Sequence, residues 1–130
     1  MLNSITETCV VAVPKDRVFA FLSDIDNLPK CSTKFVKKII PIDGKYKAVT
    51  PIGEEFIRLY TNENAGLIDI YVGPVEDNMT PAHLRIISLP DGSTAIMFTF
   101  FQYASTSDTI WKIFCEWIKV EVENIKKHFS

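Results

Sequence analysis

Features on which several common protein chemistries depend are scarce in this chain of 130 residues. Five glycines, with no glycine-rich loop, argue against a phosphate-binding loop or a dinucleotide-binding fingerprint. Three cysteines without a C-x-x-C pair, and only two histidines, argue against a zinc site and a disulfide framework. Neither a G-x-S-x-G elbow nor an H-E-x-x-H pair occurs. We therefore predict no metal, no cofactor, and free thiols in a reducing compartment.

Net charge and long apolar runs are also scarce. The formal net charge of −2 provides no basic field, which argues against nucleic acid as the main partner. No apolar run reaches the ~18 residues that a membrane span needs, and the start lacks the basic segment and apolar core of a signal peptide. The composition, with 47% hydrophobic and 23% charged residues, indicates a globular chain, and its length indicates one domain over residues 1–130. Because we find neither a span nor a signal segment, we expect a cytoplasmic location.

The beginning of the chain combines a strand pattern with helix signals. Residues 5–13 are rich in β-branched side chains and predict a strand. Pro14 suits the first turn of a helix, because its missing N–H would be unpaired there in any case. A second short helix or turn is expected from residues 23–24, with Pro29 closing it.

From about residue 34 onward the apolar residues alternate every second position, which is typical of strands. Turn residues separate the strands, and Asp91-Gly92 is the strongest hairpin signal. The short connections predict antiparallel neighbours. After residue 103, several N-capping side chains precede a helix that ends near His128. The expected strands are residues 34–42, 45–50, 54–61, 66–72, 80–89 and 94–103.

These elements predict an α+β fold of the helix-grip kind. Seven strands spaced ~4.8 Å apart make a sheet roughly 34 Å wide, whereas a helix is only about 10 Å across. A flat sheet would leave most of its apolar face wet. We therefore expect a curved antiparallel sheet of about seven strands wrapped around the long C-terminal helix. The two short helices after the first strand would close one end.

Three stretches of the sequence resemble one superfamily. They are "VAVPKDRVFAFLSDIDNLPKC" (residues 11–31), "GLIDIYVGP" (66–74) and "DGSTAIMFTFFQY" (91–103). Together with the terminal helix they are similar to START-like helix-grip domains, which include polyketide cyclase/dehydrase-like and lipid-transfer-like proteins. The resemblance spans essentially the whole chain and implies a fold far more narrowly than a function, because this scaffold hosts binders, carriers, cyclases and co-chaperone activators. Cys31 departs from the family pattern, because many relatives have a Trp at this position. This departure argues against an aromatic residue that closes this end of the cavity.

Hairpin register predicts which strand side chains share a face. A four-residue loop over residues 62–65 and a two-residue turn at Asp91-Gly92 would separate an aliphatic face from a face that mixes charged and aromatic residues. The opposed pairs predicted from these turns are Ile57–Ile70, Leu59–Ile68, Arg58–Asp69, Ile86–Met97, Leu84–Thr99 and Ala82–Phe101.

The two faces allow two interpretations. An antiparallel sheet that is covered on one side usually turns its aliphatic face to the core. We therefore expect Arg58 and Asp69 to form an exposed ion pair, and His83 to lie outside without a catalytic role. The alternative turns the mixed face inward and makes Asp69, His83, Arg85 and Tyr71 an acid–base set, which requires every buried charge to be paired.

Glu121 interrupts the apolar stripe of the C-terminal helix. Phe114, Ile118 and Ile125 lie on that stripe at helical spacing, and Glu121 falls in its middle. In one interpretation, a local rotation or bend takes the carboxylate to solvent or to a nearby Lys or Arg. In the other, it points into a cavity, where it orients a ligand or acts as an acid or base with a raised pKa.

We expect this chain to bind a small, largely apolar molecule between sheet and helix without catalysis, using Thr99 and Glu121 as the polar groups of the site. One alternative is a polyketide cyclase/dehydratase-like enzyme with a cavity carboxylate. Another is a co-chaperone-like interaction module, with Tyr60, Tyr71 and Phe100 as an exposed patch that could equally form a homodimer. The predicted cavity residues are Phe114, Trp117, Ile118, Glu121, Ile70, Leu84, Met97, Thr99 and Phe101.

Overall fold

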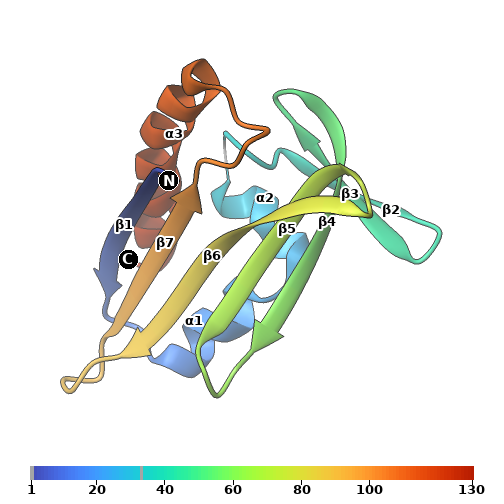
Figure 1. Ribbon diagram of the computed structural model, residues 1–130. Coiled ribbons are helices and arrows are strands. Elements are labelled where there is room, and N and C mark those ends of the chain that lie inside the picture. Colours follow the sequence, from blue (N-terminus) through green and yellow to red (C-terminus); the bar gives the residue numbers. More distant parts are fainter. Residues whose placement is uncertain (1, 33) are drawn as a thin grey trace.

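The computed structural model describes residues 2–32 and 34–130, and within them it shows seven strands, three α-helices and one 3-10 turn (Figure 1). In chain order the elements are β1 (Ser4–Val11), α1 (Lys15–Leu22), η1 (Ile25–Asn27), α2 (Leu28–Cys31), β2 (Lys38–Ile42), β3 (Lys45–Thr50), β4 (Gly53–Asn62), β5 (Leu67–Val75), β6 (Asn78–Ser88), β7 (Thr94–Phe101) and α3 (Asp108–His128).

All seven strands form one curved antiparallel sheet in the order β1-β7-β6-β5-β4-β3-β2. The helix α3 lies beside β1 and β7, whereas α1 and α2 lie behind the middle strands (Figure 1). Contacts join α3 to β1, α1 to β6, and α2 to both α3 and β2. This arrangement confirms the predicted α+β helix-grip fold, including the two short helices after the first strand.

Two predicted boundaries are wrong near α2. Pro29 lies in the first turn of α2 instead of closing a helix, which is a position where proline is tolerated because no intrahelical bond needs its N–H. The strand β2 begins at Lys38, four residues later than predicted, and residues 34–37 connect α2 to the sheet outside any strand, with the Lys37 amide donating to the Val49 carbonyl of β3 at 2.9 Å. This connecting segment becomes important at the site described below.

The β6–β7 hairpin has a longer loop than predicted. Leu89 and Ser93 still pair, since the Leu89 amide donates to the Ser93 carbonyl at 2.9 Å, so the loop consists of residues 90–92. The Gly92 amide donates to the Leu89 carbonyl at 3.0 Å and Gly92 has φ +86°, as in a type I turn followed by a left-handed residue. One extra loop residue changes the register by one, so Ile86 lies opposite Ile96, and every β7 side chain is on the face opposite to the predicted one.

The β4–β5 hairpin keeps the predicted faces but shifts its register by two residues. Its loop spans residues 63–66, and Leu59 lies opposite Ile70. The predicted Arg58–Asp69 ion pair is therefore wrong: Arg58 lies opposite Tyr71, with its guanidinium carbon 5.1 Å from the centre of that ring.

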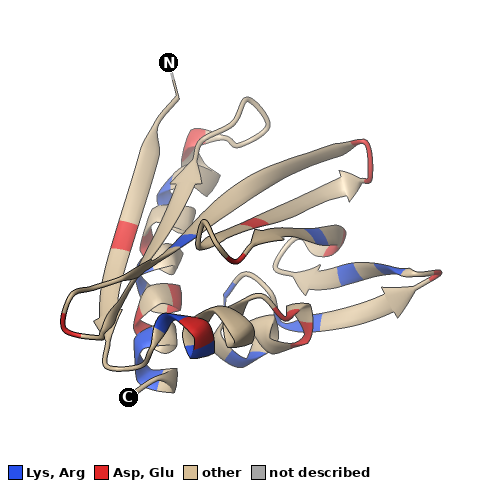
Figure 2. Cartoon of the chain, turned by 90° about the horizontal axis from the view of Figure 1, so that it is seen from below, with Lys and Arg blue, Asp and Glu red and all other residues tan. Residues whose placement is uncertain are grey.

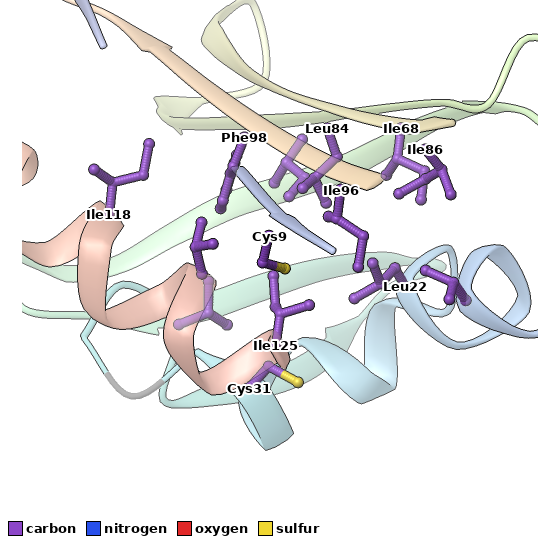
Figure 3. Close-up of a cluster of buried hydrophobic side chains, with 14 of the residues drawn as sticks. Cys9, Leu22, Cys31, Ile68, Leu84, Ile86, Ile96, Phe98, Ile118 and Ile125 are labelled. Carbon is purple, nitrogen blue, oxygen red and sulfur yellow. The ribbon is translucent and has the colours of Figure 1, made fainter. Parts of the chain in front are cut away.

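The hydrophobic core lies on the inner face of the sheet, meaning the face that carries the helices. Aliphatic residues of β5, β6 and β7 belong to the same core cluster as Ile118 and Ile125 of α3, and Figure 3 shows these side chains pointing into the space between the sheet and the helices. The expectation that the aliphatic face turns inward is confirmed. Figure 2 shows charged residues concentrated on the helices and at the hairpin ends. Within residues 2–32 and 34–130, no helix is both long and apolar enough to cross a membrane.

Alanine at Gly66 should lower the free energy of unfolding more than alanine at Gly92. Both glycines have positive φ, +62° and +86°, which costs an L-residue about 1–2 kcal/mol. A Cβ at Gly66 would also collide with the backbone carbonyl oxygen of Ile86, whereas nothing lies within 4 Å of a Cβ at Gly92. Urea unfolding of Gly66→Ala and Gly92→Ala measures the difference, and equal losses would contradict the close approach of the β4–β5 loop to β6.

Candidate functional site

The layer between the sheet and α3 holds six of the predicted cavity residues, five of them apolar and the sixth Glu121. Ile70 and Leu84 lie on the inner face of the sheet and are buried, as is Ile118 on α3. Phe114 and Trp117, also on α3, are half-buried. The structure thus brings these five residues to the two surfaces that face each other.

Three predicted cavity residues lie on the other side of the sheet. Met97 and Thr99 are opposite Arg85 and His83 on the outer face, and Phe101 contacts the His83 ring there. The Thr99 hydroxyl bonds to the Thr6 hydroxyl at 2.7 Å, so it is not available as a polar group of the inner layer. The predictions for these three residues are wrong because the β6–β7 loop has three residues instead of two. Phe98 and Phe100 take their places on the inner face, which also removes Phe100 from the predicted exposed patch.

Glu121 is buried in the layer, with 3% of its surface exposed. Its Oε1 accepts hydrogen bonds from the backbone amides of Lys34 at 2.9 Å and Phe35 at 3.3 Å. Neither proposed orientation describes this contact fully, since the carboxylate faces neither solvent nor an open cavity. It holds the segment that connects α2 to β2 against α3.

Burial raises the pKa of Glu121 above its ordinary value, because removal from water disfavours the charged form. Hydrogen bonds from the Lys34 amide, the Ser32 side chain and the Phe35 amide oppose that shift, as does the positive charge of Lys34. Desolvation is the larger effect. A carboxylate at this position is therefore less stable than a neutral acceptor of the same shape would be.

The connecting segment is fixed to α3 and to itself by further bonds. The Asn124 side-chain amide donates to the Cys31 carbonyl at 2.9 Å, and the Val36 amide donates to the Ser32 hydroxyl at 2.9 Å. Cys31, at the end of α2, and Val36, within the connecting segment, are both buried. These contacts place the ring of Phe35 between the sheet and α3.

Phe35 is the central residue of an aromatic cluster that the sequence did not predict. Its ring centre lies 5.0 Å from that of Phe100, 5.3 Å from that of Phe114 and 5.4 Å from that of Trp117, all in edge-to-face geometry. Phe35 was placed in a strand because the predicted strand began at residue 34, although residues 34–42 do not alternate strictly. The polar residues just before it are the signal that could have moved the strand start and left Phe35 in a loop.

The outer face carries a separate polar network. Asp69 Oδ1 is 2.7 Å from His83 Nδ1 and 2.9 Å from a guanidinium nitrogen of Arg85. Burial alone would raise the pKa of Asp69, but the bonds from Arg85 and His83 outweigh it and hold the pKa below its ordinary value. This is a satisfied ion network on the outer face, but Asp69 is buried, so the predicted exposed ion pair is wrong in its exposure as well as in its partner.

Two grooves lie away from the predicted cavity residues. One, of about 520 Å³, runs between β1 and α3, and the other, of about 460 Å³, lies between residues 23–25 and strands β3 and β4. Neither is lined by any predicted cavity residue. Among the residues that the structure describes, no group of three or more His, Cys, Asp or Glu side chains is arranged to hold a metal ion.

Comparisons with known proteins define the fold. No family model matches the sequence, and no curated protein matches it in a sequence comparison. The Zhui aromatase/cyclase from Streptomyces sp. R1128 matches 98% of this chain and 93% of its own, at 12% identity and a TM-score of 0.73. The Aha1 dimer from Colwellia psychrerythraea matches 98% of this chain and 96% of its own, at 15% identity and a TM-score of 0.71.

A START superfamily protein from Mycobacterium smegmatis matches 97% of this chain and 96% of its own, at 12% identity and a TM-score of 0.68. Identities this low show the fold alone. That fold is the START-like helix grip that the sequence resemblance implied.

Replacing Glu121 by alanine should lower the free energy of unfolding by about 1–3 kcal/mol, because two backbone amides lose their acceptor in a poorly hydrated place. Glu121→Gln should lower the free energy of unfolding much less, because the glutamine amide oxygen can accept the same two hydrogen bonds without a buried charge. Chemical denaturation at pH 7 compares the two variants. A Glu121→Ala variant as stable as Glu121→Gln would show that the contact to Lys34 and Phe35 contributes nothing.

The stability difference between Glu121→Gln and the unchanged protein should also depend on pH. Because the folded-state pKa of Glu121 is raised, the folded protein binds its proton more tightly than the unfolded chain does. The unchanged protein therefore loses stability relative to Glu121→Gln as pH rises from the ordinary glutamate pKa to the raised one, and the difference is constant above it. Urea unfolding from pH 4 to 8 measures this, with Glu116→Gln, exposed on the same helix, as the charge-matched control. A pH-independent difference would contradict the prediction.

Proposed function

On this START-like helix-grip fold, we propose that the protein binds a small, largely apolar molecule between the inner face of the sheet and α3. The observation that supports this most directly is the half-buried aromatic cluster of Phe35, Phe114 and Trp117 at the border of an otherwise buried core. Sites for apolar ligands are lined mainly by hydrophobic and aromatic side chains, and these rings border an apolar core while they are still partly exposed.

Partly exposed aliphatic residues of the sheet continue this surface. Val72 and Ala82 lie on the inner face beside the buried Ile70 and pack against the core without being fully covered. Leu59, on the neighbouring strand β4, is also partly exposed on the inner face, but it lines the groove beside residues 23–25. Apolar side chains on the inner face of the sheet, facing rings on α3, give two apolar walls with few polar groups.

The enzymatic alternative depends on Glu121. Its raised pKa is the kind of tuning that an acid–base residue has. Its Oε1, however, already accepts two backbone amides and faces no open cavity, so the contacts of Glu121 describe a residue that holds the connecting segment. We therefore keep binding as the proposed function. The cytoplasmic location and the homodimer stay predictions.

The test uses 8-anilinonaphthalene-1-sulfonate as an apolar probe and isoleucine methyl NMR to locate it. The methyl signals of Ile70 and Ile118, which line the layer, should shift on titration. Those of Ile52 and Ile87, which are exposed elsewhere, serve as internal controls and should not shift. Binding that moves only Ile52 or Ile87, or no saturable binding at all, would contradict the proposal.

A further inference from the structure

We propose that the Phe35 side chain occupies a ring-binding subsite of this layer, and that a ligand enters by replacing it with an aromatic ring that carries a hydrogen-bond donor. This inference rests on the proposed function and adds a chemical class of ligand to it.

The walls of the subsite do not depend on Phe35. Phe100 belongs to β7, and Phe114 and Trp117 belong to α3, so all three rings are held by regular elements. They also support one another: the ring centres of Phe100 and Phe114 are 6.2 Å apart, and those of Phe114 and Trp117 are 6.3 Å apart. If the Phe35 ring moved out, a slot lined by three aromatic rings would remain.

The geometry of the slot selects a flat ring. Phe35 meets its three neighbours at interplanar angles of 74°, 67° and 78°, so each contact is an edge-to-face pair. Such pairs contribute about 0.5–1.5 kcal/mol each beyond the burial of apolar area. An aliphatic chain in the same place would bury similar area but lose these contacts. A planar aromatic ring would restore all three.

Phe35 is the member of the cluster that can leave. It lies in the segment between α2 and β2, outside any strand or helix, and its own amide makes the longer of the two bonds to Glu121, at 3.3 Å. The backbone of the other three ring residues is held by the regular hydrogen bonds of β7 and α3. Exchange of one loop side chain therefore opens the subsite without unfolding the sheet or the long helix.

The same movement sets the second requirement for the ligand. When Phe35 leaves, its amide and that of Lys34 move away from Glu121 Oε1, and a buried carboxylate loses donors that it needs. A ligand that brings its own O–H or N–H next to the ring would replace them. Phenols and arylamines have this combination, whereas plain hydrocarbons do not.

The first experiment compares 2-naphthol, naphthalene and cyclohexanol as probes by calorimetry. The unchanged protein should bind 2-naphthol roughly tenfold more tightly than naphthalene, which lacks the donor, and than cyclohexanol, which lacks the ring. Equal affinity for 2-naphthol and naphthalene would overturn the donor requirement. Equal affinity for 2-naphthol and cyclohexanol would overturn the ring requirement.

The second experiment removes the internal competitor. Phe35→Ala should bind 2-naphthol roughly tenfold more tightly than the unchanged protein, because a larger fraction of the molecules has an open subsite. Phe56→Ala is the matched control, since Phe56 is also half-buried but lies on the outer face beside Lys47. Binding of 2-naphthol by Phe35→Ala that is no tighter than its binding by Phe56→Ala would show that the Phe35 ring does not occupy the ligand subsite, and the inference would be wrong.

The third measurement needs no variant, so it holds even if Phe35→Ala fails to fold. In the unchanged protein with labelled phenylalanine rings, saturation with 2-naphthol should move the Phe35 signals towards those of a solvent-exposed ring. If the methyl signals of Ile70 and Ile118 shift while the Phe35 ring stays in place, the proposed function stands and this inference fails. If no probe shifts those methyl signals, the proposed function itself fails.

Discussion

The arrangement of the inner layer depends on one buried carboxylate. Glu121 accepts the amides of Lys34 and Phe35, and this contact fixes the segment that carries Phe35 between the sheet and α3. A leucine at position 121 would pack well against its neighbours but could not accept either amide. The apolar stripe of α3 is interrupted because the helix has to hold a loop as well as a sheet. A polar residue in a core is usually retained for such a bond and not for stability alone.

The fold could be predicted from the sequence because its elements are long and its turns are short. Alternation over most of residues 38–101 and the capped terminal helix leave few architectures in which the apolar face of a seven-stranded sheet is covered. Register was harder, since it depends on single loop residues. At the β6–β7 hairpin, Pro90 joins Asp91 and Gly92 in the loop, and this one residue exchanges the inner and outer faces of β7.

The candidate site could be predicted only in part, for the same reason. Phe114, Trp117 and Ile118 of α3 face the sheet as the helical periodicity indicates, because that periodicity is independent of loop length. Met97, Thr99 and Phe101 were placed wrongly because their faces depend on the hairpin. Phe35 was missed because a residue in an irregular segment has no periodic signal, and its position results from long-range bonds to α3. Sequence periodicity therefore describes the walls of the layer better than what lies between them.

Cys31 is the last residue of α2, just before the connecting segment that carries Phe35. The environment of its thiol has a practical consequence. Burial, together with the nearby charge of Glu121, raises the pKa of this thiol to about 11, so almost none of it is thiolate near neutral pH while the segment stays docked. Movement of this segment away from α3 would bring water to Glu121 and to the adjoining end of α2, which would weaken both causes. The reaction rate of Cys31 with a thiol reagent thus follows the fraction of time that the segment spends away from α3, so the chain carries a natural reporter of its own opening equilibrium.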